Sequence, residues 1–130
     1  MAHENNFDAV VIGAGFAGMY ALHKIRTLGF KVKAYERASD VGGTWFWNRY
    51  PGARCDVNSL EYSYQFSEEL QQEWSWSEKY SSQPEILSYA KHVSERFDLR
   101  GNIQFETKVV QLEYDEGSNV WHGKTDKGEE

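Results

Sequence analysis

The glycines that follow the first apolar run constrain this chain more than any other feature. Residues 9–12 read AVVI, a short apolar run typical of a buried parallel strand, and Gly13, Gly15 and Gly18 follow in G-x-G-x-x-G spacing. This spacing predicts a tight turn at Gly13, close approach of the backbone to a pyrophosphate at Gly15, and packing of a helix on the sheet at Gly18. The free N–H groups at the start of that helix would face the phosphates.

The residues after the glycines supply the strand-helix-strand context that the motif requires. Apolar positions recur at helical spacing through residues 21–28, and Gly29 stands where a left-handed C-terminal cap is expected. Residues 31–36, KVKAYE, predict a second strand that ends at Glu36, 23 positions after Gly13. An acidic residue near this offset binds an adenosine ribose and repels a 2′-phosphate. The pattern favours an FAD or NAD site over an NADP site; the alternative is a strand-turn-helix with incidental glycines.

Composition favours one folded domain and excludes several classes of partner. The chain has 130 residues, 40% of them hydrophobic, and a net charge of -6 without a long basic run, so we expect neither nucleic acid nor membrane as a partner. The apolar run through residues 9–22 lacks a basic leader and is too short to span a bilayer. The single cysteine favours a reducing, cytoplasmic setting, and the four histidines show no metal-ligand spacing, so no metal is expected.

The rest of the chain completes a three-layer α/β, Rossmann-like unit with a parallel sheet, inserted helices and a small group of strands. Residues 41–56, VGGTWFWNRYPGARCD, have no helical or strand period and predict a loop, and residues 57–80 predict irregular structure with short helical pieces. The capping-box pattern SQPE at 82–85 predicts the start of a helix that ends at Gly101. Residues 103–125 predict two or three strands.

Taken together, these motifs resemble the N-terminal part of the FAD-binding domain of Baeyer-Villiger monooxygenases. The resemblance extends over residues 7–130 and is carried by GAGFAG, YER, GGTWFWNRYPGARCD, EYSYQF, SQPEI and FDL. Members of this family use FAD, NADPH and O2 to insert one oxygen atom beside a ketone carbonyl, through a C4a-peroxyflavin, and give an ester or lactone. The resemblance implies that residues 1–130 are an incomplete FAD-binding domain, which requires its remainder and an NADP-binding domain.

The resemblance also implies roles for individual residues. It places FAD contacts at Gly13, Gly15, Phe16, Ala17, Gly18, Glu36, Arg37, Thr44, Trp45, Asp56, Tyr62 and Val109. Arg54, Cys55 and Asp56 match a stretch that faces the nicotinamide cofactor. Asp56 is the expected catalytic residue, because a carboxylate there would orient an arginine that the family supplies from further along its chain.

Simpler roles and other functions stay open from the residues alone. Asp56 could cap a helix that begins near Val57, Arg54 could be solvated or form a weak surface ion pair with Asp56, and Cys55 could be a small buried residue. The alternative functions are an N-hydroxylating or sulfur-oxidising flavin monooxygenase, or an FAD-binding module without catalysis of its own.

Overall fold

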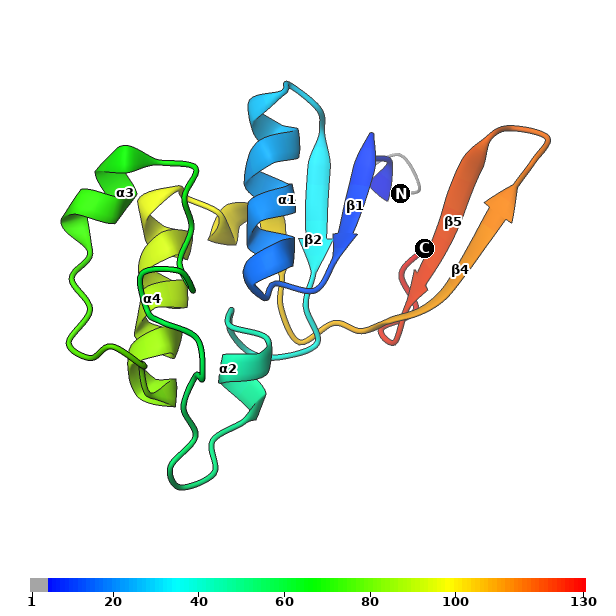
Figure 1. Ribbon diagram of the computed structural model, residues 1–130. Helices are drawn as coiled ribbons and strands as arrows, with labels where there is room; N and C mark the ends of the chain where they lie inside the picture. Colours follow the sequence, from blue (N-terminus) through cyan, green and yellow to red (C-terminus); the bar gives the residue numbers. More distant parts are fainter. Residues whose placement is uncertain (1–4) are drawn as a thin grey trace.

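A computed structural model describes residues 5–130 and shows a parallel sheet with its helices gathered beside it (Figure 1). The sheet contains β1 (Ala9–Ile12), β2 (Val32–Tyr35) and β3 (Ile103–Gln104) in the order β1-β2-β3, and both pairings are parallel. β3 comes from far along the sequence, so the whole helical segment between β2 and β3 is an excursion from the sheet. The predicted Rossmann-like α/β class is confirmed.

Helix α1 (Phe16–Thr27) connects β1 to β2 and packs against the sheet. It buries Met19 and Leu22, which occupy one face of the helix. The helix ends at a left-handed Gly29 with a φ of 92°, as the sequence predicts. The core beneath α1 is apolar and consists of Val11, Ala14, Met19, Leu22, Val32, Ala34, Val41, Ala90, Leu99 and Ile103.

The excursion contains three helices and a short 3-10 turn. These are α2 (Thr44–Trp47), α3 (Glu68–Glu73), α4 (Gln83–Arg96) and η2 (Arg100–Asn102). Helical spacing predicts a buried face made of Ile86, Tyr89, Ala90, Val93 and Phe97. The first four are buried on α4, whereas Phe97 follows the last residue of the helix and is only partly buried. The prediction that residues 41–56 form only a loop is wrong, because this segment contains α2. The N–H groups of Trp45 and Phe46 donate to the carbonyls of Gly42 and Gly43, which starts the helix.

The sequence signals predicted to begin and end α4 are the capping box SQPE at 82–85 and Gly101. Neither has the role that the sequence predicts. The helix does begin after Ser82, but the Ser82 side chain makes no capping hydrogen bond. Glu85 instead accepts hydrogen bonds from the backbone N–H and the hydroxyl of Ser77, at 3.2 and 2.5 Å, so it stabilises the preceding loop. The helix ends at Arg96, and the left-handed residue after it is Asp98, with a φ of 50°, because a short polar side chain tolerates this conformation.

The hairpin of β4 (Val109–Asp115) and β5 (Val120–Thr125) projects away from the sheet (Figure 1). The sequence predicts these strands at residues 109–114 and 120–125, on either side of a turn signal at 116–119, so β4 is one residue longer than predicted. Apolar side chains of the hairpin are exposed, and so are Val10 and Ile12 on β1, where only Val11 between them is buried. Within residues 5–130, none of the helices has both the length and the apolar character needed to cross a bilayer.

Candidate dinucleotide-binding site

The glycine turn, residues 13–18, brings the end of β1 directly against the start of α1. Gly13 has a φ of 99°, and its N–H donates to the carbonyl of Tyr35 at 2.8 Å. A Cβ atom on Gly18 would lie only 1.9 Å from the carbonyl oxygen of Gly13, so the helix can approach the strand this closely only with glycine there. The first backbone N–H groups of α1, at Phe16, Ala17 and Gly18, have no acceptor within the helix and are available to an anion.

Glu36 connects the end of β2 to this turn. Its side chain is buried, with a relative exposure of 5%. Its Oε1 accepts a hydrogen bond from the N–H of Ala14 at 2.8 Å, and its Oε2 accepts one from the N–H of Ala38 at 2.7 Å. Each carboxylate oxygen has further acceptor capacity, so both contacts are compatible with the predicted ribose contact. The N–H of Ala14 is already bonded and is therefore not among the donors left for a phosphate.

A second glycine pair, Gly42 and Gly43, places the tryptophan loop, residues 41–56, against the glycine turn. The N–H of Gly42 donates to the carbonyl of Ala14 at 3.0 Å. A Cβ atom on Gly43 would lie 2.9 Å from the Cα atom of Gly15, and Gly43 has a φ of 54°. This pair is not among the site residues that the sequence predicts. The GG dipeptide indicates that another part of the chain or a ligand approaches the backbone closely there. It does not indicate which part.

Helix α2 then buries Trp45 beside two of the other predicted site residues. The Trp45 side chain is 8% exposed and packs with Cys55 and Ile86. Its indole Nε1 donates a hydrogen bond to the Tyr62 hydroxyl at 3.0 Å, and the two rings meet edge to face with centroids 5.9 Å apart. The structure therefore gathers Trp45, Cys55 and Tyr62 in one cluster.

Gln83 holds this cluster from the start of α4 and was missed by sequence reasoning. Its side-chain Nε2 donates to the carbonyl of Trp45 at 2.5 Å, and its backbone N–H donates to the carbonyl of Ala53 at 2.9 Å. Gln83 is buried. In the sequence it is only the second residue of the helix-start motif, so nothing local indicates a contact to a residue 38 positions away.

Replacing Tyr62 with phenylalanine tests whether this hydrogen bond stabilises the loop. The substitution leaves the indole N–H of Trp45 without its acceptor in a largely buried place, and we expect a loss of about 1–3 kcal/mol in the free energy of unfolding. Urea denaturation of the two proteins measures the difference. Tyr50 is 63% exposed, and Tyr50→Phe is the matched control that should be neutral. Equal losses in the two variants would show that the Trp45 bond contributes no specific stability.

Arg54 and Asp56 are exposed residues of the tryptophan loop. The structure shows neither an ion pair between them nor a helix capped by Asp56. Arg54 pairs with Glu78, with an N–O distance of 2.8 Å, rather than with Asp56. No helix begins near Val57, because the chain turns there, and the side chain of Asn58 accepts the N–H of Leu60 at 3.0 Å. Asp56 is exposed and follows the buried Cys55.

The remaining predicted contacts are spread more widely. Thr44 is the exposed first residue of α2, and Arg37 is exposed with its guanidinium 5.1 Å from the ring centroid of Trp47. Val109 begins β4 and pairs with Thr125, outside the cluster around Trp45. In the described part of the chain, no three His, Cys, Asp or Glu side chains converge on a place that could hold a metal.

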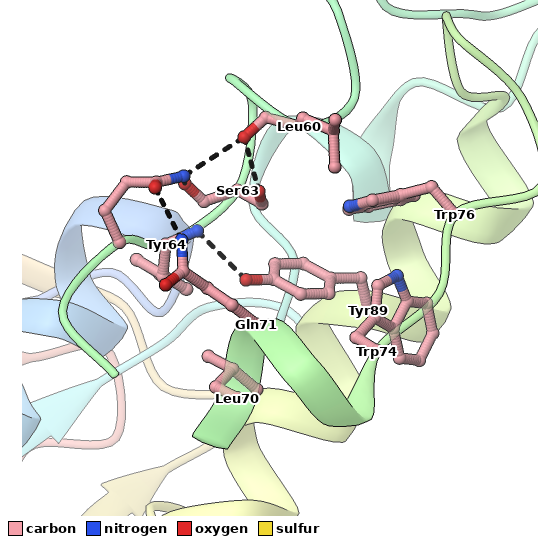
Figure 2. Close-up of a pocket in the computed structure, with 9 residues that line it drawn as sticks. Leu60, Ser63, Tyr64, Leu70, Gln71, Trp74, Trp76 and Tyr89 are labelled. Carbon is pink, nitrogen blue, oxygen red and sulfur yellow. Dashed lines mark hydrogen bonds between the residues drawn. The ribbon is translucent and has the colours of Figure 1, made fainter. Parts of the chain in front are cut away.

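Two hollows flank the aromatic residues of the excursion. The first, of ≈ 260 Å³, is shown in Figure 2; it is lined by Leu60, Ser63, Tyr64, Gln65, Leu70, Gln71, Trp74, Trp76 and Tyr89. The second, of ≈ 430 Å³, is wider and lies against Phe16 and Ala17 at the start of α1. Burial raises the pKa of Tyr64 and that of Tyr89, so both phenols are neutral. The Tyr64 hydroxyl donates to the carbonyl of Phe16, and the Tyr89 hydroxyl accepts the N–H of Tyr64 at 3.0 Å.

Comparisons with known proteins agree with this geometry. Residues 11–72 match the family described as NAD(P)-binding Rossmann-like domain. The fold and the glycine turn thus define a Rossmann-like dinucleotide-binding unit.

Individual relatives are more specific than the Rossmann-like family model, because all of those below are monooxygenases. A Baeyer-Villiger monooxygenase of Pseudooceanicola batsensis is 51% identical over 125 residues, which cover 95% of this chain and 23% of that protein. A phenazine N-monooxygenase of Lysobacter antibioticus is 47% identical over 127 residues, which cover 97% of this chain and 24% of that protein. The solved structure of an oxidized steroid monooxygenase bound to NADP is 59% identical, with a TM-score of 0.93, over 94% of this chain and 23% of that one. Over nearly its whole length the chain is similar to Baeyer-Villiger monooxygenases, and it spans about a quarter of the length of the curated relatives it matches.

Proposed function

We propose that this chain is the FAD-binding part of an NADPH-dependent flavin monooxygenase that inserts one oxygen atom of O2 beside a ketone carbonyl to give an ester or lactone. The observation that carries the proposal is the contact between the glycine turn and the tryptophan loop through Gly15 and Gly43. This contact brings the unpaired N–H groups at the start of α1 close to the loop that carries Trp45, which is bonded to Tyr62, and it supports one continuous site. Relatives at 51 and 59% identity, a Baeyer-Villiger and a steroid monooxygenase, support the reaction class.

The residues present fit an FAD molecule on chemical grounds. Backbone N–H groups from Phe16 to Gly18 would bind the pyrophosphate, and the remaining acceptor capacity of Glu36 would bind the adenosine ribose. Arg37 would lie on the adenine side with Val109, and Thr44, Trp45 and Tyr62 would border the flavin. When bound, FAD supplies the transfer of electrons to O2, and this chain positions it. Because the Glu36 carboxylate repels a 2′-phosphate, NADPH would bind elsewhere and meet this chain at the stretch from Arg54 through Cys55 to Asp56.

Further parts of the protein would complete the domain. Val10 and Ile12 leave one side of the edge strand β1 apolar and exposed, and Leu112, Tyr114 and Trp121 do the same for the hairpin. Such surfaces pack against other protein in folded domains. We propose that the remainder of the FAD domain and an NADP domain cover them. The single free and buried Cys55 supports a reducing, cytoplasmic setting.

N-oxygenation is a second candidate reaction, because the phenazine N-monooxygenase is 47% identical over nearly the whole chain. The two reactions are separated by supplying the complete protein with NADPH, isotopically labelled O2, and either ketones or phenazines. The ketone proposal expects one labelled oxygen in an ester or lactone and faster NADPH consumption with a ketone. A labelled N-oxide without any ester would establish the second candidate, and the absence of bound flavin would reject both.

Asp56 is proposed as a positioning residue for this chemistry. In the complete enzyme, Asp56→Ala should lower kcat by up to ~10²-fold, the cost of misplacing a catalytic group, while the KM for the ketone changes little. Asp56→Glu should restore part of the rate, since it keeps the carboxylate. Stopped-flow measurement of flavin reduction and reoxidation identifies the affected step. Glu116, exposed in the hairpin turn, gives the control Glu116→Ala; unchanged kinetics in Asp56→Ala as well would remove Asp56 from the site.

A further inference from the structure

A series of aromatic rings leads from the proposed flavin site into the excursion. The edge-to-face pair of Trp45 and Tyr62 is followed by Phe16, whose ring centroid lies 5.5 Å from that of Tyr62. Phe16 lies 5.3 Å from Tyr64 and 5.9 Å from Tyr89. These rings lie far apart in the sequence, yet each contacts the next, so the path is built by tertiary packing.

The series continues to two further indoles at the hollow of Figure 2. The ring centroid of Trp76 lies 4.9 Å from that of Tyr89, the centroid of Trp74 lies 5.3 Å from Tyr89, and the two indoles are 5.6 Å apart. Figure 2 shows these three side chains beside one another at the wall of the hollow. Trp76 also packs on the cluster that contains Trp45, which gives a second and shorter connection.

We propose that these rings form a path for one-electron oxidation, which carries an electron vacancy from Trp45 beside the flavin out to Trp76 and Trp74. The inference rests on the proposed function, because it requires a flavin next to Trp45. Indoles and phenols are the side chains most readily oxidised by one electron, which is why a connected set of them differs from a core of Leu and Val. When an oxidising species forms at the flavin, electrons can reach it through these rings, so the oxidising equivalent moves away from the flavin.

Each step of the path is a transfer of one electron. Trp45 loses an electron to its oxidant, here oxidised flavin excited by blue light, which is reduced by that electron. Trp76 or Trp74 then loses an electron that refills the vacancy at Trp45, directly or by way of the intervening rings. The Tyr64 hydroxyl donates a hydrogen bond to the carbonyl of Phe16. A carbonyl is too weak a base to take up the phenol proton when the ring is oxidised. The indoles are therefore the lasting sites of the vacancy.

Trp74 lies beside a group of three polar side chains, Glu73, His92 and Arg96. Its Nε1 atom is buried and, within residues 5–130, has no hydrogen-bond partner, so no described group is placed to accept the indole proton of an oxidised Trp74. Its ring lies 5.2 Å from that of His92, which is bonded to the carboxylate of Glu73 at 3.1 Å. Arg96 also bonds to Glu73, so this carboxylate is shared between His92 and Arg96. A thiol or ascorbate that reaches the hollow would return one electron and restore the indole.

Transient absorption after a blue flash tests the path in the complete, flavin-loaded protein. We expect the wild-type protein to show a tryptophan radical that persists, because the vacancy has moved away from the reduced flavin. Replacing both outer indoles, Trp74→Phe with Trp76→Phe, keeps ring packing but removes their redox chemistry, and the persistent signal should be lost through rapid recombination. Trp121 lies on the hairpin, where its ring pairs with Tyr114 outside this series of rings, and Trp121→Phe should leave the signal unchanged.

A second measurement covers the case in which the double variant folds poorly. Mass spectrometry after prolonged illumination should find oxidised indole at Trp74 and Trp76 in the wild-type protein, and added ascorbate should suppress it. Radical lifetimes that are equal in the wild type and a correctly folded double variant, or oxidation confined to Trp45, would overturn the path. Neither result affects the proposed monooxygenase function, which fails instead if the protein binds no flavin.

Discussion

Replacing Gly18 with alanine is expected to destabilise the chain by about 3 kcal/mol or more, at the upper end of the cost of overpacking a well-packed interior. The added methyl carbon would lie 1.9 Å from the carbonyl oxygen of Gly13 and 2.8 Å from its carbonyl carbon. Both are main-chain atoms of the turn, so no flexible side chain can move aside. The only relief is to shift α1 away from β1, which also opens the phosphate-binding turn. Urea denaturation and FAD titration of the complete protein measure the two effects.

Gly101 supplies the matched control for that substitution. A Cβ atom there would meet nothing within 4 Å, and the residue does not have a positive φ, so Gly101→Ala should not destabilise the chain and should add about 0.4–1 kcal/mol at most to the free energy of unfolding. A Gly18→Ala protein with the stability and FAD affinity of Gly101→Ala would show that the close contact between α1 and β1 is not needed.

Glu36→Gln is expected to weaken both the apoprotein and its affinity for FAD. The carboxylate accepts N–H groups from Ala14 and Ala38 on its two oxygens, whereas an amide offers one oxygen and an NH2 group that is only a donor. One buried backbone N–H therefore loses its acceptor, at a cost of about 1–3 kcal/mol in the free energy of unfolding. Urea denaturation of the apoprotein gives this cost, and FAD titration gives the effect on binding.

The apoprotein measurement separates the two roles of Glu36. A residue that serves only the ribose would leave the stability of the apoprotein unchanged and lower FAD affinity alone. Glu95, exposed on α4, gives the control Glu95→Gln, which should alter neither quantity. If Glu36→Gln matches that control in the apoprotein, Glu36 does not hold the turn, and the short hydrogen bonds to Ala14 and Ala38 contribute no net stability.

The sequence was sufficient for the parts of this protein that local pattern determines. The strand, glycine turn and helix through Gly29, the buried face of α4 and the two strands of the hairpin all follow from periodicity and turn residues that lie close together. The close approach at Gly18 follows from spacing as well.

The contacts that complete the site could not be read in this way, because they join residues far apart in the sequence. The bond from Gln83 to Trp45 and the contact of Gly43 with Gly15 depend on how the excursion folds back on the sheet. The same physics explains why the capping box was wrong: Glu85 found Ser77, a tertiary partner that the four-residue motif does not contain.

The most direct test of the account is the visible absorption spectrum of the complete protein, purified without added cofactor and then titrated with FAD. The account predicts a flavin spectrum with tight FAD binding that is lost in Gly18→Ala, and NADPH oxidation that quickens when a ketone is added. A well-folded, colourless protein that takes up no FAD would contradict it.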